Sequence, residues 1–356
     1  MNTKHWFMAI ATLAIAGCSQ NEIMEKKADA DKSIGFNVYT GVQTKGTETT
    51  NDKLGAANAG NGFAVVALIP KNGGSDYDVY MTPRHVTKND GGSWTYSDIA
   101  HWPVGGESLS FYSYAPYSDT HDGTSNTGGG INTKPESTEL FNSTTPSIEF
   151  TIKSDWANMV DLVAAKNENV SPTDAAISVA FSHVLTRIGF KAKTSADIGS
   201  GTTVKVTKLE ILGSTSLSGS CFYEKGTYNI KDGSWSSPTA LSGDYTITMA
   251  NSGVEVSSTA ANLLGTDNYL FCIPVSSLQA DKIKVKITYT ITSNSVTSEK
   301  TQIASIPQSH FAKGTAYSYL FTITLKEIKF TLDTMGSWTD ASSADTGLTP
   351  TDIPTT

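Results

Sequence analysis

The residue whose surroundings predict a definite chemical modification is Cys18. It follows an apolar run from Trp6 to Ala16 and the small residue Gly17, and a single basic residue, Lys4, precedes the run. This order is typical of a secretory signal that ends in a bacterial lipobox. We therefore predict that residues 1–17 are removed and that the Cys18 thiol takes a diacylglycerol while its amine is acylated. Several acyl chains on one residue would give stable membrane anchoring. The alternative is an ordinary cleaved signal in which Cys18 is incidental.

No other group of residues in the sequence has the types and spacing of a catalytic or metal site. The sequence contains no His-Glu-x-x-His, no Gly-x-Ser-x-Gly and no phosphate-binding glycine loop. The segment 29–33 superficially resembles a calcium loop but lacks the glycine and the later glutamate. Histidines beyond the signal are scattered, at His85, His101, His121, His183 and His310. We interpret His183, within a strand-like run, as a core or capping residue rather than a ligand or base.

These observations lead us to expect no metal, no cofactor and no enzymatic activity. A hydrolase remains an alternative that only the absence of motifs opposes. A second alternative rests on aromatic residues around Trp94, Trp102 and Tyr114. If exposed, they would form a stacking platform for sugars, and the chain would be a surface lipoprotein that binds glycans. Aromatic residues at period two more often pack within a sheet, and we favour that interpretation.

Composition narrows the class of protein further. Charged residues make up 17% of the 356 residues, and the formal net charge is −8. No basic cluster is visible, which argues against a nucleic-acid partner. Apart from the signal, no apolar run approaches the roughly 20 residues that a spanning helix needs. Abundant Thr, Ser, Gly and Tyr favour β-structure, because such side chains suit pleated sheets and turns.

After the signal, residues 18–32 form a polar stretch that we interpret as a flexible tether. The first predicted strand follows at 33–39, with Ile34, Phe36 and Val38 on one face at period two. A polar segment from 40 to 61 comes next, and we expect it to be exposed.

Short apolar or alternating runs, separated by turn residues, fill the rest of the chain. In the first half they lie at 62–70, 77–81, 93–96, 109–114, 148–152 and 159–165. In the second half they lie at 177–181, 204–212, 220–223, 245–249, 269–275, 283–291, 317–325 and 328–332. Many short strands with regular turn signals predict two β-sandwiches in tandem. We place them at 33–166 and 175–338, with a linker at 167–174 and a polar tail at 339–356.

Two further cysteines, Cys221 and Cys272, lie in strand-like runs. An oxidising compartment permits a disulfide between them. Two separate small apolar residues are the interpretation that we favour.

Several segments together resemble the fimbrillin (Mfa-like and FimA-like) family of Bacteroidales surface lipoproteins. Besides the lipobox and the first strand, they are Val42–Gly46, Leu109–Pro116, Asp161–Ala165, Ile177–Ile188, Phe311–Tyr319 and the strand Thr322–Leu325 with Trp338 after it. Their order spans nearly the whole chain beyond the signal.

The resemblance implies two transthyretin-like β-sandwich domains and a non-enzymatic pilus subunit that supports adhesion. It implies an outer-membrane lipoprotein precursor whose partners are other pilus subunits and, through adhesion, surface ligands. In polymerising members a protease cuts after a basic residue in the loop that follows the first strand, and a C-terminal strand of the next subunit fills the groove. Here the matching bond is Lys45-Gly46, whereas the family commonly has arginine before alanine. The period-two segment 327–333, with Ile328, Phe330 and Leu332, is the expected donor strand, and stalk, tip and anchor roles all stay open.

Overall fold

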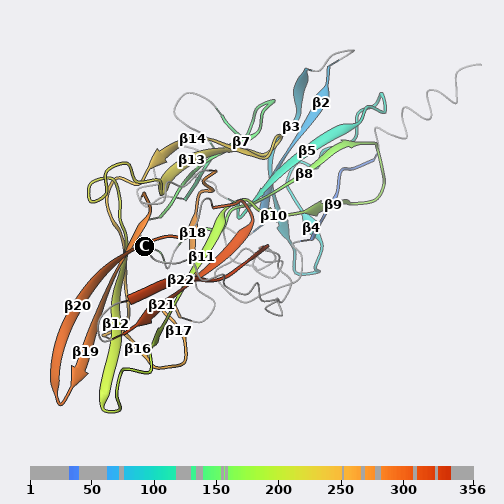
Figure 1. Cartoon of the computed structure of the whole chain (residues 1–356). Helices are drawn as coiled ribbons and strands as arrows, with labels where there is room; N and C mark the ends of the chain where they lie inside the picture. The colour runs from blue at the N-terminus through green and yellow to red at the C-terminus, as the bar shows by residue number, and fades with distance from the viewer. Residues whose placement is uncertain are drawn as a thin grey trace, which may run out of the picture.

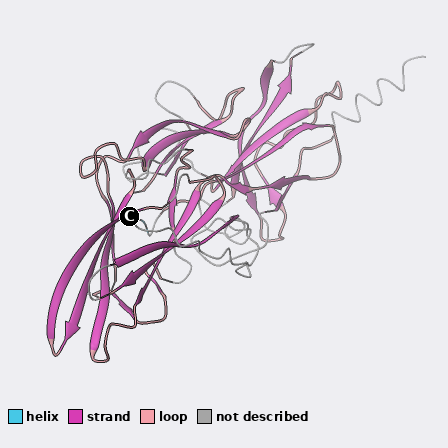
Figure 2. Cartoon of the chain, in the orientation of Figure 1, coloured by secondary structure: helices cyan, strands magenta, loops and turns pink. Residues whose placement is uncertain are grey.

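The computed structural model consists of β-strands. It describes residues 32–39, 62–71, 76–117, 130–133, 139–153, 156, 159–250, 252–265, 269–276, 282–307, 311–324 and 328–337. Every element assigned within these ranges, β1 to β22, is a strand (Figure 2), which confirms the predicted all-β class. In the same ranges, no helix has the length and apolarity that a membrane crossing requires.

The N-terminal half is organised around a six-stranded sheet. Its spatial order is β10 (Ser182–His183), β8 (Val163–Val170), β5 (Leu109–Ala115), β2 (Phe63–Pro70), β3 (Tyr77–Lys88) and β4 (Trp94–Thr95). The central strands β2 and β5 are almost entirely buried, because both of their faces are covered; β2 is a continuous apolar run, and β5 includes the buried Ser110 and Ser113. The hairpin predicted around Asn89–Gly92 joins β3 and β4, and Gly92 has the positive φ, 84°, that the turn requires.

A two-stranded sheet covers one face of this central sheet. It pairs β1 (Phe36–Tyr39) with β9 (Ile177–Ala180), and the two strands run parallel. Phe36 of β1 belongs to the same apolar cluster as Phe63 of β2 and Phe111 of β5.

Three further sheets form the rest of the molecule. The four-stranded sheet has the order β14 (Ser234–Ala240), β13 (Tyr223–Asn229), β7 (Ser147–Thr151) and β6 (Gly130–Asn132). A five-stranded sheet has the order β17 (Ala261–Asn262), β11 (Thr186–Thr194), β21 (Thr315–Ile323) and β22 (Ile328–Ser337), with β18 (Leu270–Cys272) also paired to β11. Another has the order β15 (Tyr245–Thr248), β12 (Thr202–Ile211), β19 (Lys284–Ser293) and β20 (Val296–Ser305), with β16 (Val254–Val256) on β12. Figure 1 shows the long β19–β20 hairpin at the opposite end of the molecule from the six-stranded sheet.

Two apolar clusters meet at the central sheet. One face of β2 and β5 packs with β1 and β9, through residues such as Val65 and Phe111. The opposite face contributes Val66 and Tyr112 to a larger cluster that continues into the C-terminal sheets. The central sheet is therefore a shared wall between the region of the first strand and the body of the protein.

Strand pairing differs from the division expected from the sequence. Residues 167–170, expected in the linker, are the end of β8 and pair with β5. The strand at 177–180, expected in the second sandwich, pairs with β1, and β7, expected in the first, pairs with β13. Composition signalled a break at 167–174, but pairing partners far apart in the chain decide which sheet a strand joins.

Both cysteines in the described ranges carry free thiols. Cys272 is buried and Cys221 is half-buried. The favoured interpretation, two separate residues without a bridge, is therefore correct.

Candidate functional site

The backbone of the first strand is held on both edges. Ile34 donates to the carbonyl of Ala100 at 2.8 Å, and Trp102 donates to the carbonyl of Lys32 at 3.0 Å. On the other edge, Ile177 donates to the carbonyl of Gly35 at 2.8 Å, and the parallel ladder with β9 continues to Tyr39. Residues 32–34 thus bond to residues 100–102 on one edge, and residues 35–39 bond to β9 on the other edge.

The side chains predicted to face inward do so. Ile34 is 1% exposed and Phe36 is 3% exposed, while Val38 is partly buried against the same cluster. The ring of Phe36 meets Phe63 and Phe111 edge-on, at centroid distances of 6.0 and 5.8 Å. The period-two pattern of the sequence therefore identified the buried face of β1 correctly.

A buried tyrosine closes one side of this groove. The Tyr96 hydroxyl donates to the carbonyl of Ile34 at 2.7 Å and accepts from the backbone N–H of Ala100 at 3.3 Å. Its ring lies 5.6 Å from that of Phe36. Burial raises the pKa of Tyr96, although the bond from Ala100 opposes the shift. Tyr96 therefore remains a neutral donor, and its hydrogen bond holds the backbone of Ile34 in a fixed position in the groove.

The sequence did not reveal which residues line the groove that β1 occupies. They include Tyr96, Trp102, Ile177 and Val179, all buried. Trp102 is anchored by its indole N–H, which donates to the carbonyl of Thr173 at 3.0 Å. The alternation of Ile177 and Val179 was visible in the sequence, but only the pairing shows that it faces β1.

The aromatic platform proposed as an alternative is wrong for this structure. Trp102 is 2% exposed and Tyr114 is fully buried. Trp94 packs edge-on against Phe63 at 5.6 Å. These rings fill the core, so they present no shared surface to a sugar.

The candidate donor strand lies elsewhere in the chain. β22 is the edge strand of its sheet and pairs antiparallel with β21. Ile328, Phe330 and Leu332 are partly buried against the larger apolar cluster. The ring of Phe330 lies 4.4 Å from that of Phe321. The structure therefore does not bring β22 and the groove of β1 together within one chain.

Three predicted site residues, Cys18, Lys45 and Gly46, lie outside the described residues. The described chain ends at Tyr39 on one side of the 40–61 segment and resumes at Gly62, which leads directly into β2.

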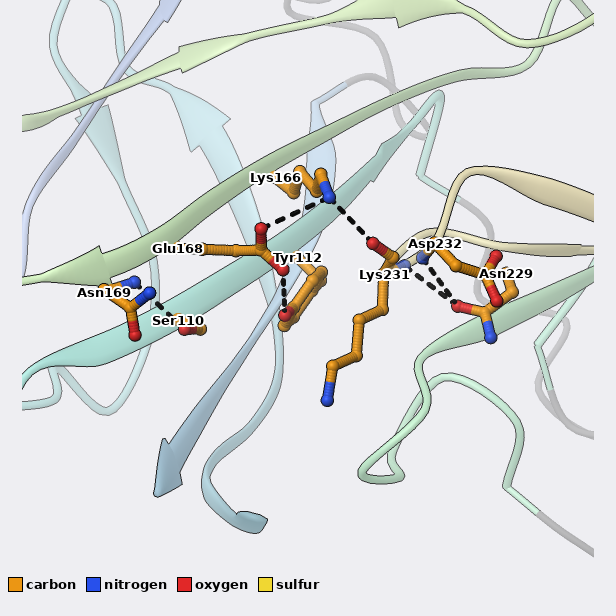
Figure 3. Close-up of polar contacts among 8 residues, drawn as sticks. All are labelled: Ser110, Tyr112, Lys166, Glu168, Asn169, Asn229, Lys231 and Asp232. Carbon is orange, nitrogen blue, oxygen red and sulfur yellow. Dashed lines mark hydrogen bonds and ion pairs between the residues drawn. The ribbon is translucent and has the colours of Figure 1, made fainter. Parts of the chain in front are cut away.

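A polar cluster connects the central sheet to the turn between β13 and β14 (Figure 3). Tyr112 donates to the carboxylate of Glu168 at 2.9 Å, and Lys166 lies 3.2 Å from the second oxygen of that carboxylate. Lys166 also donates to the backbone carbonyl of Lys231 in the turn at 2.8 Å. Desolvation, followed by the bond to Glu168, raises the pKa of Tyr112 far above its ordinary value. This cluster joins two sheets and contains no arrangement typical of a catalytic centre.

His183 is also structural in character. Its Nδ1 lies 3.1 Å from a carboxylate oxygen of Asp161, and both side chains are buried. Over the ranges given above, no three His, Cys, Asp or Glu residues come together as metal ligands would.

Comparison with known proteins decides the family. A model described as fimbrillin-like matches residues 44–338. This chain belongs to the fimbrillin-like family. It is 33% identical to the fimbrium subunit Fim1C of Phocaeicola vulgatus over 391 aligned residues, which cover 97% of this chain and 99% of that protein. A crystal structure of a fimbrial protein from Bacteroides vulgatus is 27% identical, with a TM-score of 0.70, and the alignment covers 87% of this chain and all of that one.

The fimbrillin-like match begins five residues after β1 ends and runs through β22. The residues that line the groove and the candidate donor lie within this match, whereas β1 lies before it; the alignment with the fimbrium subunit covers 97% of this chain.

Proposed function

We propose that this chain is a non-enzymatic subunit of a surface pilus and that it is assembled by exchange of β1 for a strand of the next subunit. The observation that carries the proposal is the construction of β1. It is a short strand that bonds to β9 along one edge, follows residues 32–34 that bond to 100–102, and buries one face, and residues 40–61 join it to β2. Family membership and the similarity to a fimbrium subunit support the same role.

The exchange follows from the effective concentration of β1. While the chain is intact, β1 is held beside its groove and excludes any competing strand. A cut at Lys45-Gly46 turns β1 into a separate peptide, which can leave and expose the apolar floor formed by Phe63 and Phe111. An incoming strand then recovers both the backbone bonds to β9 and the burial of alternate side chains.

The donor that we propose is the segment 327–333 of the neighbouring copy or of a related subunit. Ile328, Phe330 and Leu332 repeat the period-two apolar spacing of Ile34, Phe36 and Val38. As the edge strand of its sheet, β22 has one neighbour to leave.

The precursor, in this proposal, is a lipoprotein anchored in the outer membrane through Cys18. We divide its body into two transthyretin-like sandwiches, near 33–166 and 175–338, which the β1–β9 and β7–β13 pairs connect. The partners are other fimbrillin-like subunits and, through adhesion, surface ligands. Substitution of Cys18 by alanine should move the protein from the detergent phase to the aqueous phase. An unchanged partition would contradict lipidation.

Limited trypsin digestion tests the exchange. Lys45 and Lys53 are the only basic residues in 40–61. In a Lys53→Gln background, digestion should release the N-terminal segment and yield ladders on size analysis. The matched variant, Lys53→Gln with Lys45→Gln, should stay intact in this segment and stay monomeric. A chain that is cut at Lys45 yet remains monomeric and binds no synthetic 327–333 peptide would refute the proposed assembly.

A further inference from the structure

An apolar hollow of about 340 Å³ lies beside the β13–β14 hairpin, far along the chain from the groove of β1. Its floor consists of buried side chains, those of Ile273, Val275 and Phe311. Aromatic and proline rings stand around the floor, from Tyr223, Trp235, Pro238 and Pro274, and Lys313 lies among the polar residues of the lining. This size, and a mainly apolar lining with few polar groups, are typical of a binding pocket.

The walls of this hollow, which we call the Trp235 pocket, are held in place by their own contacts. The Trp235 indole N–H donates to the carbonyl of Val184 at 2.9 Å, and its ring lies 5.2 Å from that of Tyr228. Val275 and Phe311 exchange two backbone hydrogen bonds, each of 2.9 Å. Because the walls are already ordered, an occupant would enter without a large cost for arranging them.

One cation is fixed at the pocket. The Lys313 ammonium donates to the carbonyl of Gly233 at 2.6 Å and lies 5.4 Å from the centre of the Tyr228 ring. Lys313 is exposed, and the pKa of its ammonium is lowered by desolvation while the nearby Asp232 carboxylate opposes this shift. The ammonium is therefore accessible to an acidic group of an occupant.

The strand register identifies a segment that begins at this pocket. In the β21–β22 ladder, Ser337 lies opposite Thr315, which is only two residues beyond Lys313. The last residue of β22 therefore lies near the Trp235 pocket, and the sequence continues from it with residues 338–356. The first residue of this segment is Trp338, its largest apolar side chain. A short connection makes closure onto an adjacent site inexpensive in entropy.

The charge of that segment is complementary to the pocket. It carries Asp340, Asp345 and Asp352 and no lysine or arginine. Asp340 lies two residues after Trp338, so an indole in the pocket would keep this carboxylate close to Lys313.

We propose that the Trp235 pocket is the docking site of this chain's own C-terminal segment, with Trp338 in the apolar hollow and Asp340 at Lys313. Because Trp338 directly follows β22, the docked indole latches the end of that strand. The docking itself does not depend on the proposed function, but the role of the docked segment in assembly rests on it. The latch would hold the candidate donor on its own sheet until assembly.

The docking is tested on the unprocessed chain, where no strand exchange takes place. A variant that ends at Ser337 should bind a synthetic 338–356 peptide saturably and in a 1:1 ratio by calorimetry. Peptides with Trp338→Ala should bind at least about tenfold more weakly, which corresponds to about 1.4 kcal/mol. The matched Leu348→Ala peptide should bind like the unchanged peptide. On the protein side, Lys313→Met should weaken binding and reduce its dependence on salt.

A second measurement covers the possibility that the shortened chain folds poorly. In the full chain, hydrogen exchange of the 311–315 amides should quicken on Trp338→Ala and stay unchanged on Leu348→Ala. Equal effects of the two substitutions, or no binding of the peptide by a folded shortened chain, would overturn the proposal. Dimers of the full chain that grow with concentration and are lost on Trp338→Ala would overturn docking within one chain and indicate docking between copies. The two proposals can fail separately. A chain whose 338–356 segment does not dock can still form ladders after cleavage at Lys45, and a chain whose segment docks can fail to form them.

Discussion

Removal of the Phe36 ring should loosen the first strand more than any other single change within it. The side chain is 3% exposed, and three rings surround it at centroid distances between 5.6 and 6.0 Å. Truncation of a buried phenylalanine to alanine costs about 3–5 kcal/mol, because apolar burial is lost and a cavity remains. Part of that cost falls on edge-to-face contacts, each worth about 0.5–1.5 kcal/mol beyond burial.

We expect Phe36→Ala to lower the free energy of opening β1 by about 3–4 kcal/mol, from the lower half of that range, because the strand lies near the surface of the molecule. At 1.4 kcal/mol per factor of ten, the open population should rise by roughly 140- to 700-fold. Native-state hydrogen exchange measures this directly, through the Ile177 amide that bonds to the carbonyl of Gly35.

The control lies in the same strand. Asn37 is exposed, so Asn37→Ala should change the opening free energy by less than about 0.5 kcal/mol. An opening less than tenfold more frequent in Phe36→Ala, or an equal effect of Asn37→Ala, would refute the reasoning that side-chain burial holds β1 in its groove.

Three further outcomes follow from the described contacts. Burial raises the pKa of Tyr228 to about 12, so the neutral side chain stabilises the fold below its ordinary pKa of 10, and this contribution is lost as pH rises from about 10 to 12. In Tyr228→Phe, the free energy of unfolding should therefore fall less steeply over this pH range, and a pH profile identical to that of the unchanged protein would contradict the prediction. A thiol reagent should modify Cys221 in the native protein but Cys272 only after unfolding, because burial is complete at Cys272 and raises the pKa of its thiol; equal rates would be inconsistent with this. Lys166→Met should cost about 1 kcal/mol or less in urea unfolding, since the lysine is half-exposed and its ion pair is screened by water; a loss above about 3 kcal/mol would mean that the cluster in Figure 3 contributes far more than surface pairs do.

Local patterning in the sequence was sufficient for most strands. The alternation of Ile34, Phe36 and Val38 and the continuous apolar run of β2 each indicated the strand and its buried side chains. Pairing was beyond reach, because it depends on contacts between segments far apart in the chain. Ile177 and Val179 alternate like any half-buried strand, and nothing local shows that they face β1.

The candidate site divides in the same way. The period-two alternation of apolar residues predicted β1, the strand that we propose is displaced. The sequence did not predict that Tyr96 and Trp102 line the groove of β1. The aromatic residues around Trp102 had instead suggested an exposed platform, because an aromatic cluster has the same sequence pattern whether it faces solvent or a second layer of strands.

The parallel pairing of β1 with β9 has a consequence for the time course of folding. A ribosome or a secretion pore delivers the chain from its N-terminus, so β1 emerges first and its partner only when residues 177–180 have followed. The parallel β11–β21 ladder likewise waits for residues 315–323, almost at the end of the chain. Such distant contacts slow folding, because long loops must close before the contacts form. During delivery the floor around Phe63 and Phe111 therefore exists before its cover is complete. A nascent chain is consequently most open to a foreign strand, or to aggregation, in the interval between the emergence of β5 and that of β9.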